Sequence, residues 1–560
     1  MEKLMNVLLQ TPVVALTLAS LMTAQEVQLL ASDGGSLDEF GAAVSLGSGL
    51  ALCGGPLADN GGGVDAGAAY LFDADPTGAT PGVELALLMA ADAAPGDNFG
   101  EAVSVSDGLA LVGAPWAYAG GQYSGAAYLF DGDPASPTLG VQLKRLSPSG
   151  GSFFDAFGHG VALGGKLALV GTPYSHFGAG SVYLFDADRA SATFGTQLLE
   201  IPAPPGASGT AFGLSVALDG GLALVGASHG TGAVAGAGCA YLFNANPASP
   251  TFGHELIKFQ ASDGADHDLF GFSVALADGL ALMGAHRDDD LGPRSGSTYL
   301  FDANPLSSTF GQELLKLTAP DGVQDDSFGY SVALASGQAL VGAWRDDDGG
   351  PNTGSAYLFD AQPMSATFGV QLAKLTYSAG EDYDGFGKSV ALTAGLALVG
   401  VPGDDDNGFQ SGGAVLRPTS SAPCAFSNYC QGAPNSAGSG ASMGHVGTGS
   451  VLANDLVLTA TGCPTNQFGI FYYGAGQLQF PFGNGWRCVG SGGVGLFRFP
   501  PVNTGASASV SWLLDVTSPP QPTGQINAGS TWHFQFWYRD PLSGGANFNL
   551  SDGLRVTFCM

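Results

Sequence analysis

The sequence predicts an all-β protein, a seven-bladed β-propeller followed by a C-terminal β-sandwich domain. Two observations predict the propeller. A Phe-Gly pair recurs seven times at intervals of 55 to 59 residues, and a second signature of the type Gly-Ala-Pro follows each pair after about 14 residues. Self-similarity at such a period indicates a repeat architecture. The pairs begin at Phe40, Phe99, Phe157, Phe212, Phe270, Phe328 and Phe386, and the second signatures at Gly54, Gly113, Gly171, Gly226, Gly284, Gly342 and Gly400.

Each unit contains four short apolar runs bounded by Gly, Pro, Asp, Asn or Ser. In the unit that begins at Phe328 these runs are FGYSVAL, QALVGAW, SAYLFDA and VQLAKL. Short runs with such boundaries are typical of strands, and no stretch keeps helical apolar spacing over the length of a helix. Four strands in each of seven units predict the propeller, and the 89 Gly residues suit crowded inner strands and tight turns.

The seventh unit lacks a fourth strand. It ends with a degenerate third strand, Gly412 to Pro418, after which the composition changes. Residues 26–30 (EVQLL), ahead of the first Phe-Gly pair, match the fourth-strand pattern of other units, such as ELLKL at 313–317. We therefore expect residues 26–30 to complete blade seven beside Val415 and Leu416, which removes two exposed sheet edges.

The Phe-Gly and Gly-Ala-Pro elements, together with the YLFD segments, resemble the FG-GAP repeat over residues 26–418. That family includes the propeller of integrin α-subunits and many secreted bacterial proteins. The resemblance implies extracellular adhesion or ligand binding, often with calcium. In the integrin type, calcium lies in loops between the first and second strands. Here those connections are tight turns such as Ser106-Asp107-Gly108, so the integrin calcium ligands are not carried over to any residue.

The propeller region carries the whole net charge of −31. Residues 25–422 contain 12 Lys plus Arg against 43 Asp plus Glu, whereas residues 423–560 contain 4 of each class. This acidity argues against binding to nucleic acid or to anionic membrane surfaces, since both need basic patches.

Carboxylates cluster in the loops of units five to seven. Second-to-third-strand loops hold Asp288-Asp289-Asp290, Asp346-Asp347-Asp348 and Asp404-Asp405-Asp406, and interblade loops hold Asp263, Asp266, Asp268, Asp321, Asp325, Asp326, Glu381, Asp382 and Asp384. Both loop types emerge on one face of an up-and-down blade, so we expect a shared acidic face, interrupted at unit four by Ser228-His229-Gly230. Dense carboxylates suit Ca²⁺. The candidate ligands are Asp288, Asp290, Asp346, Asp348, Asp404 and Asp406. The alternative is solvated turns, in which Asp is a preferred residue.

The sequence predicts no catalytic residues. The eight His are scattered, without paired zinc-ligand spacing. Residues 226–230 match G-x-S-x-G, but a nucleophilic Ser228 would need a strand-to-helix turn, whereas this segment lies between two strands. The YLFD segments indicate interblade packing. Trp116 and Trp344, each in a blade loop, either anchor a ligand or pack within their own loops, and we favour packing.

The N-terminus resembles a secretory signal peptide. Residues 1–24 contain Lys3, an apolar run from Val13 to Met22, and Ala24 at the expected cleavage site. The run is too short to span a membrane, and no other segment is long enough. We expect residues 1–24 to be removed and the protein to be exported.

The C-terminal region predicts a disulfide-bearing sandwich. Alternating segments at 455–460, 469–473, 510–516, 531–538 and 554–558 indicate strands. Five of the seven Cys lie here, which favours disulfides, and several pairings with one Cys left over are open. These five are Cys424, Cys430, Cys463, Cys488 and Cys559. Cys53 and Cys239 are expected to be buried free thiols. The aromatic residues of the region either pack its core, which we favour, or form a sugar-stacking platform. They are Tyr472, Tyr473, Trp486, Trp532 and Trp537.

These features predict a secreted or cell-surface, non-enzymatic protein. It comprises a signal peptide (1–24), a seven-bladed propeller (25–420) and a Cys-containing β-sandwich (421–560). The expected role is adhesion or ligand binding through a propeller face, with an extracellular protein or glycan as partner. We expect a monomer, with calcium as the candidate cofactor. The alternatives are a structural surface or matrix component, and an extracellular hydrolase or lyase with an axial active site.

Overall fold

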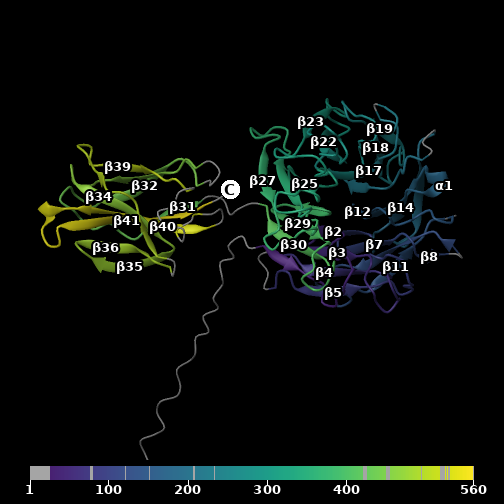
Figure 1. The fold of residues 1–560 in the computed structure, drawn as a ribbon, viewed down its shortest axis with the longest axis horizontal. Coiled ribbons are helices and arrows are strands. Elements are labelled where there is room, and N and C mark those ends of the chain that lie inside the picture. The colour runs from purple at the N-terminus through teal and green to yellow at the C-terminus, as the bar shows by residue number, and fades with distance from the viewer. Residues whose placement is uncertain are drawn as a thin grey trace, which may run out of the picture. The chain divides into compact units, whose positions relative to one another are not determined.

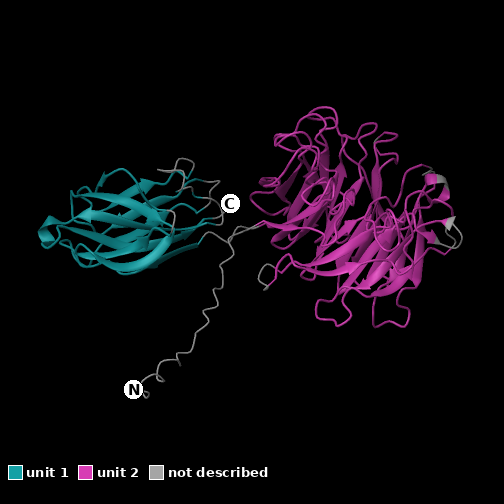
Figure 2. Ribbon diagram, turned by 60° about the horizontal axis from the view of Figure 1, so that its bottom comes forward, with its two compact units in different colours: residues 1–25, 421–560 teal, residues 26–420 magenta. Residues whose placement is uncertain are grey.

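Seven four-stranded antiparallel sheets form the N-terminal unit, residues 26–420, as expected for a seven-bladed propeller. The computed structural model describes residues 26–75, 80–119, 122–149, 152–205, 209–232, 234–419, 425–449, 454–492, 495–516, 524, 526 and 530–558. The predicted signal peptide lies outside these residues. A second unit includes residues 421–560, and Figure 2 shows the two units in different colours.

Each blade runs from an inner strand to an outer strand in sequence order, except for blade seven. Blade one comprises β2 (Ala43–Gly47), β3 (Leu50–Gly55), β4 (Ala68–Asp73) and β5 (Glu84–Leu88), and blade two comprises β6 (Ala102–Ser106), β7 (Leu109–Ala114), β10 (Ala126–Asp131) and β11 (Gln142–Leu146). Blade three comprises β12 (Val161–Gly164), β13 (Leu167–Thr172), β14 (Ser181–Asp186) and β15 (Gln197–Pro202). Blade four comprises β16 (Val216–Asp219), β17 (Leu222–Ala227), β18 (Cys239–Asn244) and β19 (Glu255–Phe259). Blade five comprises β20 (Ser273–Ala277), β21 (Leu280–Ala285), β22 (Ser297–Asp302) and β23 (Glu313–Leu317); blade six β24 (Ser331–Ala335), β25 (Gln338–Ala343), β26 (Ser355–Asp360) and β27 (Gln371–Leu375); blade seven β28 (Val390–Thr393), β29 (Leu396–Val401), β30 (Gly413–Pro418) and β1 (Val27–Leu29). Blade two adds a small hairpin, β8 (Tyr118–Ala119) and β9 (Gln122–Tyr123), and blade three a one-turn helix, α1 (Ser175–Gly178).

The N-terminal strand closes the ring, as the sequence predicts. β1 pairs antiparallel with β30, with Val27 opposite Leu416 and Gln28 opposite Val415. The inner strands contact one another in order around the ring, and β28 of blade seven contacts β2 of blade one. Figure 1 shows the neighbouring strand β29 of blade seven beside β2. The Ser389 hydroxyl also donates to the Gly41 carbonyl, 2.7 Å away, so blade seven is bonded to blade one.

The two glycine signatures meet at every blade interface. Within a blade, the amide of the Phe-Gly glycine donates to the carbonyl of the Gly-Ala-Pro glycine, as Gly41 does to Gly54 at 2.9 Å. Between blades, a Cβ on Gly54 would lie 2.0 Å from the carbonyl oxygen of Gly100 in the next blade, and the same approach recurs between Gly400 and Gly41. Only glycine fits such a contact.

The YLFD segments pack between the blades and then cap their loops. The Tyr, Leu and Phe side chains are buried, as at Tyr299, Leu300 and Phe301. The following Asp302 accepts hydrogen bonds from the Asn304 amide and the Thr309 hydroxyl, which ends the strand. The predicted interblade packing is thus confirmed. Cys53 and Cys239 are buried free thiols, also as expected.

The C-terminal unit is β-rich and has two principal sheets that share one core. Its elements are β31 (Ala425–Tyr429), β32 (Ser442–Val446), β33 (Val457–Thr461), β34 (Phe468–Gly474), β35 (Gly476–Phe482), β36 (Gly485–Gly490), β37 (Leu496–Arg498), β38 (Val502–Asn503), β39 (Val510–Leu513), β40 (Thr531–Arg539), the 3₁₀ turn η2 (Pro541–Ser543) and β41 (Phe548–Thr557). A six-stranded sheet runs β31-β41-β40-β34-β37, with β38 also on β34, and faces a three-stranded sheet, β32-β33-β39.

Strand β41 starts six residues earlier than the sequence pattern predicts. Asp552 and Gly553 resemble a turn, but the strand passes through them because the Asp552 carboxylate accepts hydrogen bonds from the Met443 amide and the Asn428 side chain. Cys430 and Cys488 form a disulfide, and Cys463 is a buried free thiol, whereas Cys424 and Cys559 lie outside the described residues. In the described part of the chain, no helix is long and apolar enough to span a membrane.

The glycine contact can be tested by adding one methyl group. Gly284→Ala places Cβ 2.0 Å from the Gly329 carbonyl oxygen, so the two blades must separate. We expect the free energy of unfolding to fall by about 3 kcal/mol, measured by urea denaturation. Gly61→Ala is the control, because a Cβ there meets nothing within 4 Å. Equal stability of the two variants would contradict the contact.

Ring closure can be tested at Leu29, which is fully buried in β1. Leu29→Ala should lower the stability of the whole propeller by about 2–5 kcal/mol, because it leaves a cavity between the first and last parts of the ring. The measurement is the melting temperature by circular dichroism. Leu85→Ala, in the outer strand β5, is the control because its side chain is 38% exposed. An unchanged melting temperature for Leu29→Ala would show that β1 is dispensable.

Candidate functional site

One face of the propeller carries most of the differences between the repeats. We call it the loop face: it is formed by the second-to-third-strand loops and the interblade loops. The opposite turn face holds the tight first-to-second-strand turns and the capped third-to-fourth-strand loops. The two loop types of the loop face contact each other, because the Tyr299 hydroxyl lies 2.8 Å from both Asp263 of an interblade loop and Asp288 of a second-to-third-strand loop. The predicted shared face is therefore present in blade five.

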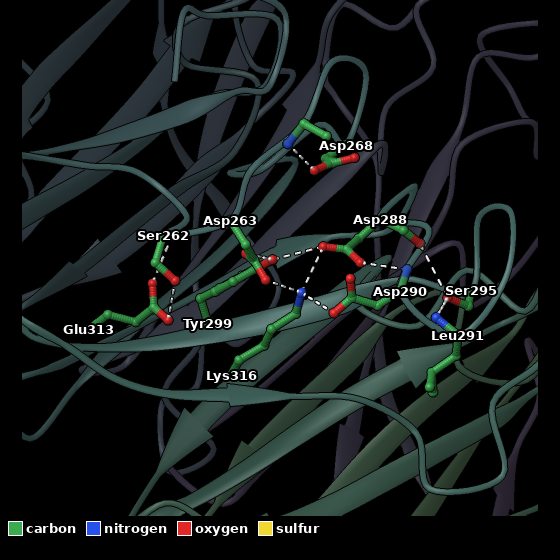
Figure 3. A network of polar contacts seen from close by, with 11 residues as sticks. Ser262, Asp263, Asp268, Asp288, Asp290, Leu291, Ser295, Tyr299, Glu313 and Lys316 are labelled. Atoms are coloured by element: carbon green, nitrogen blue, oxygen red, sulfur yellow. Dashed lines mark hydrogen bonds and ion pairs between the residues drawn. The ribbon is translucent and has the colours of Figure 1, made fainter. Parts of the chain in front are cut away.

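In blade five, three carboxylates surround one lysine (Figure 3). The Lys316 ammonium nitrogen lies 2.7 Å from Asp263 Oδ2, 3.1 Å from Asp288 Oδ2 and 2.5 Å from Asp290 Oδ2. Burial acts to raise the pKa of Asp263, but the hydrogen bonds and positive charge of Lys316 outweigh it and the pKa is lowered. Burial acts to lower the pKa of Lys316, and the carboxylates reverse this and raise it.

Blade six repeats this arrangement one unit later. Lys374 lies 2.8 Å from Asp321, 2.9 Å from Asp346 and 2.5 Å from Asp348, and Tyr357 donates to this cluster. We call the two clusters the lysine centres. Each has three carboxylates and one ammonium group, so each retains net negative charge. Sequence analysis identified the carboxylates and missed the lysines.

Blade seven has two of the three carboxylates, Asp404 and Asp406, but Ala379 stands where the other blades have Asp263 and Asp321, and both the lysine and the tyrosine are replaced. Its fourth strand is β1, which places Gln28 where the other blades have lysine, and Val415 stands at the tyrosine position. The Gln28 amide donates to Asp404 and Asp406 at 3.3 and 3.0 Å. Tyr377, from the preceding interblade segment, places its hydroxyl 2.8 Å from Asp404. Tyr377 thus supplies the hydroxyl group that the third-strand tyrosine supplies in blades five and six, whereas Gln28 brings no positive charge to the position of the lysine.

This geometry does not fit a calcium ion. At Asp288, Asp290, Asp346 and Asp348 a lysine ammonium lies among the carboxylate oxygens, and at Asp404 and Asp406 an amide N–H donor points at them. Calcium needs six to eight oxygen ligands. Among the described residues, no three His, Cys, Asp or Glu side chains are arranged to hold a metal ion. Calcium binding stays a prediction that the structure does not support, and calorimetry with Ca²⁺ and EGTA would decide it.

Blade four interrupts the acidic face, as expected from Ser228-His229-Gly230. Lys258, at the position of Lys316, donates to the Thr231 carbonyl at 2.6 Å instead of to a carboxylate. Ser228 follows β17 directly, is buried, and lies 3.1 Å from Nδ1 of His229. The described residues between it and the next strand β18 contain turns and no helix, so the strand-to-helix geometry of a nucleophile motif is missing among them.

The turn face of blades two and three holds a cavity of about 460 Å³. Its basic residues are already paired, since Lys166 lies 2.9 Å from Asp188 and Arg189 lies 2.7 Å from the buried Asp131. No histidine lines this cavity. Two carboxylates, Asp107 and Asp188, lie among its lining residues, and the hydrolase alternative stays a prediction.

The aromatic residues singled out in the sequence are placed differently from one another. In the C-terminal unit Tyr472, Tyr473 and Trp532 are buried, so they pack the core as favoured. Trp486 is 37% exposed on the hairpin β35–β36. In the propeller, Trp344 contacts Tyr330 and Arg345.

Trp116 is partly buried and belongs to a group of otherwise exposed aromatic side chains on the loop face of blades two and three. It contacts Phe154, with ring centroids 6.2 Å apart. Phe153, Phe154, Tyr118 and Tyr123 complete the group, and sequence analysis missed them. The available signal was the adjacent pair Phe153-Phe154 at a position where units five and six carry polar or acidic residues.

A buried aspartate two residues before the Phe-Gly pair couples the loop face to pH. Burial raises the pKa of Asp268, Asp326 and Asp384 to about 6 in each case. Each accepts a hydrogen bond from the backbone amide three residues earlier, at 2.6 to 2.7 Å. Because the folded state binds these protons more tightly than the unfolded chain does, their protonation stabilises the fold. This stabilisation is lost as pH rises through about 6.

Asp326→Asn tests this coupling. The amide still accepts the backbone hydrogen bond and carries no charge, so the melting temperature should rise at about pH 7.5 and change little at about pH 4.5. Asp278→Asn, an exposed turn residue on the turn face, is the control and should behave alike at both pH values. A loss of stability at about pH 7.5 would show that the ionised carboxylate is needed.

A family model described as the FG-GAP repeat matches seven segments of the chain. A search of curated proteins with the same chain found no match. Each segment begins near the fourth strand of one blade and ends within the third strand of the next, as 83–130 does from β5 to β10. The matched residues are 23–72, 83–130, 141–185, 196–243, 254–301, 312–359 and 370–416. Because these segments cover more than half of the chain and coincide with its seven blades, the protein belongs to the FG-GAP repeat family.

Proposed function

We propose that this is a secreted or cell-surface protein that binds an extracellular protein or glycan through the loop face of its propeller, as a monomer. Membership of the FG-GAP family supports a ligand-binding propeller. The Cys430–Cys488 disulfide supports an oxidising compartment outside the cytosol. An adhesive role follows if the ligand belongs to another cell or to a matrix.

The observation that carries the proposal is the divergence of the loop face on a uniform scaffold. The strands and glycine contacts repeat in all seven blades, whereas the loops hold lysine centres in blades five and six, Ser228 and His229 in blade four, and exposed aromatic groups in blade two. Function is expected on loops that a rigid scaffold positions. On the turn face, the first-to-second-strand connections remain short turns in the described residues.

The proposal is tested by removing equal charge from the two faces. The full chain is assayed on an array of purified glycans and on a library of extracellular protein domains. Asp289, Asp347 and Asp405, the exposed middle residues of the three loop triplets, are changed together to Asn; the control changes Asp107, Asp219 and Asp278 on the turn-face side to Asn. We expect the first variant to lose about tenfold in affinity for the ligand found.

The control should bind as the unmodified protein does. Equal losses in both variants would point to a non-specific charge effect. Binding that survives every loop-face change would place the ligand site elsewhere.

A further inference from the structure

Four exposed aromatic side chains and the partly buried Trp116 form a continuous surface on the loop face of blades two and three. We call them the aromatic patch: Trp116, Tyr118, Tyr123, Phe153 and Phe154. Successive ring centroids from Trp116 through Phe154, Phe153 and Tyr123 to Tyr118 are 6.2, 3.9, 6.2 and 5.3 Å apart. The last four side chains are 45 to 55% exposed. Contiguous apolar exposure of this kind marks an interaction surface, whereas isolated exposed residues do not.

The fold does not require these rings. Phe154 lies three residues before its Phe-Gly pair with φ of +66°, and this position has a positive φ in every repeat. The other six residues there are Leu37, Gly96, Gly209, His267, Asp325 and Tyr383. Glycine adopts this left-handed conformation without strain, whereas phenylalanine does so at a cost. Phe154 therefore combines backbone strain with exposure of an apolar ring. The position accepts residues as different as glycine, histidine and aspartate, so its backbone conformation does not require an aromatic ring.

Hydrogen bonds join the backbone segments that carry the patch. Tyr118 and Tyr123 are paired across the hairpin β8–β9, and the Phe154 amide donates to the Tyr123 carbonyl at 2.9 Å. Arg145, which is paired with Asp92 at 3.0 Å, also donates to the Tyr118 carbonyl. The backbone at Tyr118, Tyr123 and Phe154 is thus held in place, which lowers the entropy that these positions lose on binding.

The angles between the aromatic rings of the patch favour a polypeptide ligand over a glycan. Adjacent rings are inclined at 53 to 77°, so their faces do not form the flat platform on which sugar rings stack. An uneven aromatic surface instead accepts side chains between the rings, and Trp and Tyr are the residues that dominate protein interfaces.

Charge indicates the kind of polypeptide. The chain has a net charge of −31, and the lysine centres on the same face retain negative charge, so a basic partner is attracted and an acidic one repelled. Aromatic faces also attract cations. The propeller itself shows this contact, since the Arg345 guanidinium lies 4.5 Å from the Trp344 ring centre.

We propose that the aromatic patch docks a basic polypeptide segment that carries Arg or Lys together with large apolar side chains. The proposal rests on the proposed function and specifies where and what the loop face binds. Apolar side chains enter between the rings, and guanidinium or ammonium groups lie over the ring faces.

The test uses short random peptides displayed on phage and selected on the immobilised full-length protein. We expect the enriched peptides to combine Arg or Lys with large apolar residues. Phe154→Gly should weaken their binding about tenfold or more, and Trp116→Ala should do the same. Tyr383→Gly is the matched control: Tyr383 has the same repeat position and a φ of +73° and is 63% exposed, but it lies in the interblade loop before blade seven.

Stability separates binding from folding. Phe154→Gly should unfold at the same temperature as the unmodified protein or higher, because glycine relieves the backbone strain. A lower melting temperature would show that Phe154 is a packing residue and would overturn the proposal. The proposal would also be overturned if the selection enriched acidic or uncharged peptides, or no peptides at all. Equal binding by Phe154→Gly and the unmodified protein would overturn it too, as would binding of the patch to glycans on an array instead of to peptides. If patch variants bind normally while the Asp289, Asp347 and Asp405 variant loses its ligand, this inference fails and the proposed function stands.

Discussion

The architecture depends on one close contact between backbones. At every interface the Gly-Ala-Pro glycine of one blade lies against the carbonyl of the Phe-Gly glycine of the next, so closely that a Cβ on Gly54 would be 2.0 Å from Gly100 O. The two signatures of the repeat are therefore the two halves of a single contact. In a ring of blades, stability is largely a sum over neighbouring interfaces, and the seventh contact, between Gly400 and Gly41, joins the ends.

The same contact explains why the loops can differ. The constrained atoms belong to the backbone and to the buried Tyr, Leu and Phe of each third strand, so the loop side chains are not needed to define the interface. The loop face can then hold a lysine centre in one blade and an aromatic patch in another. Blade seven shows the limit of this freedom: with Val415 in place of tyrosine, Tyr377 from the neighbouring segment supplies both a ring near Phe386 and a hydroxyl for Asp404.

The sequence predicts the features that depend on local pattern. The Phe-Gly period, the EVQLL strand that closes the ring and the acidic loops of blades five to seven are all patterns of spacing and composition. The lysine centres could not be found in this way, because Lys316 reaches Asp290 only through the register that sets Tyr299 opposite Lys316 across β22 and β23. The aromatic patch likewise joins Trp116 to Phe154 from different blades' loops. In β41, a tertiary contact of Asp552 overrides an apparent turn.

The acidic triplets divide into structural and available carboxylates. In Asp288-Asp289-Asp290 the first and third residues bind Lys316, and the middle residue is exposed and contacts the Arg294 amide. Asp346-Asp347-Asp348 has the same division around Lys374. A triplet that resembles a cation site in the sequence is thus partly neutralised from within, by a lysine on the neighbouring strand. What a partner meets on this face is the exposed middle aspartate, the remaining negative field and the aromatic patch, a combination that selects basic and apolar groups together.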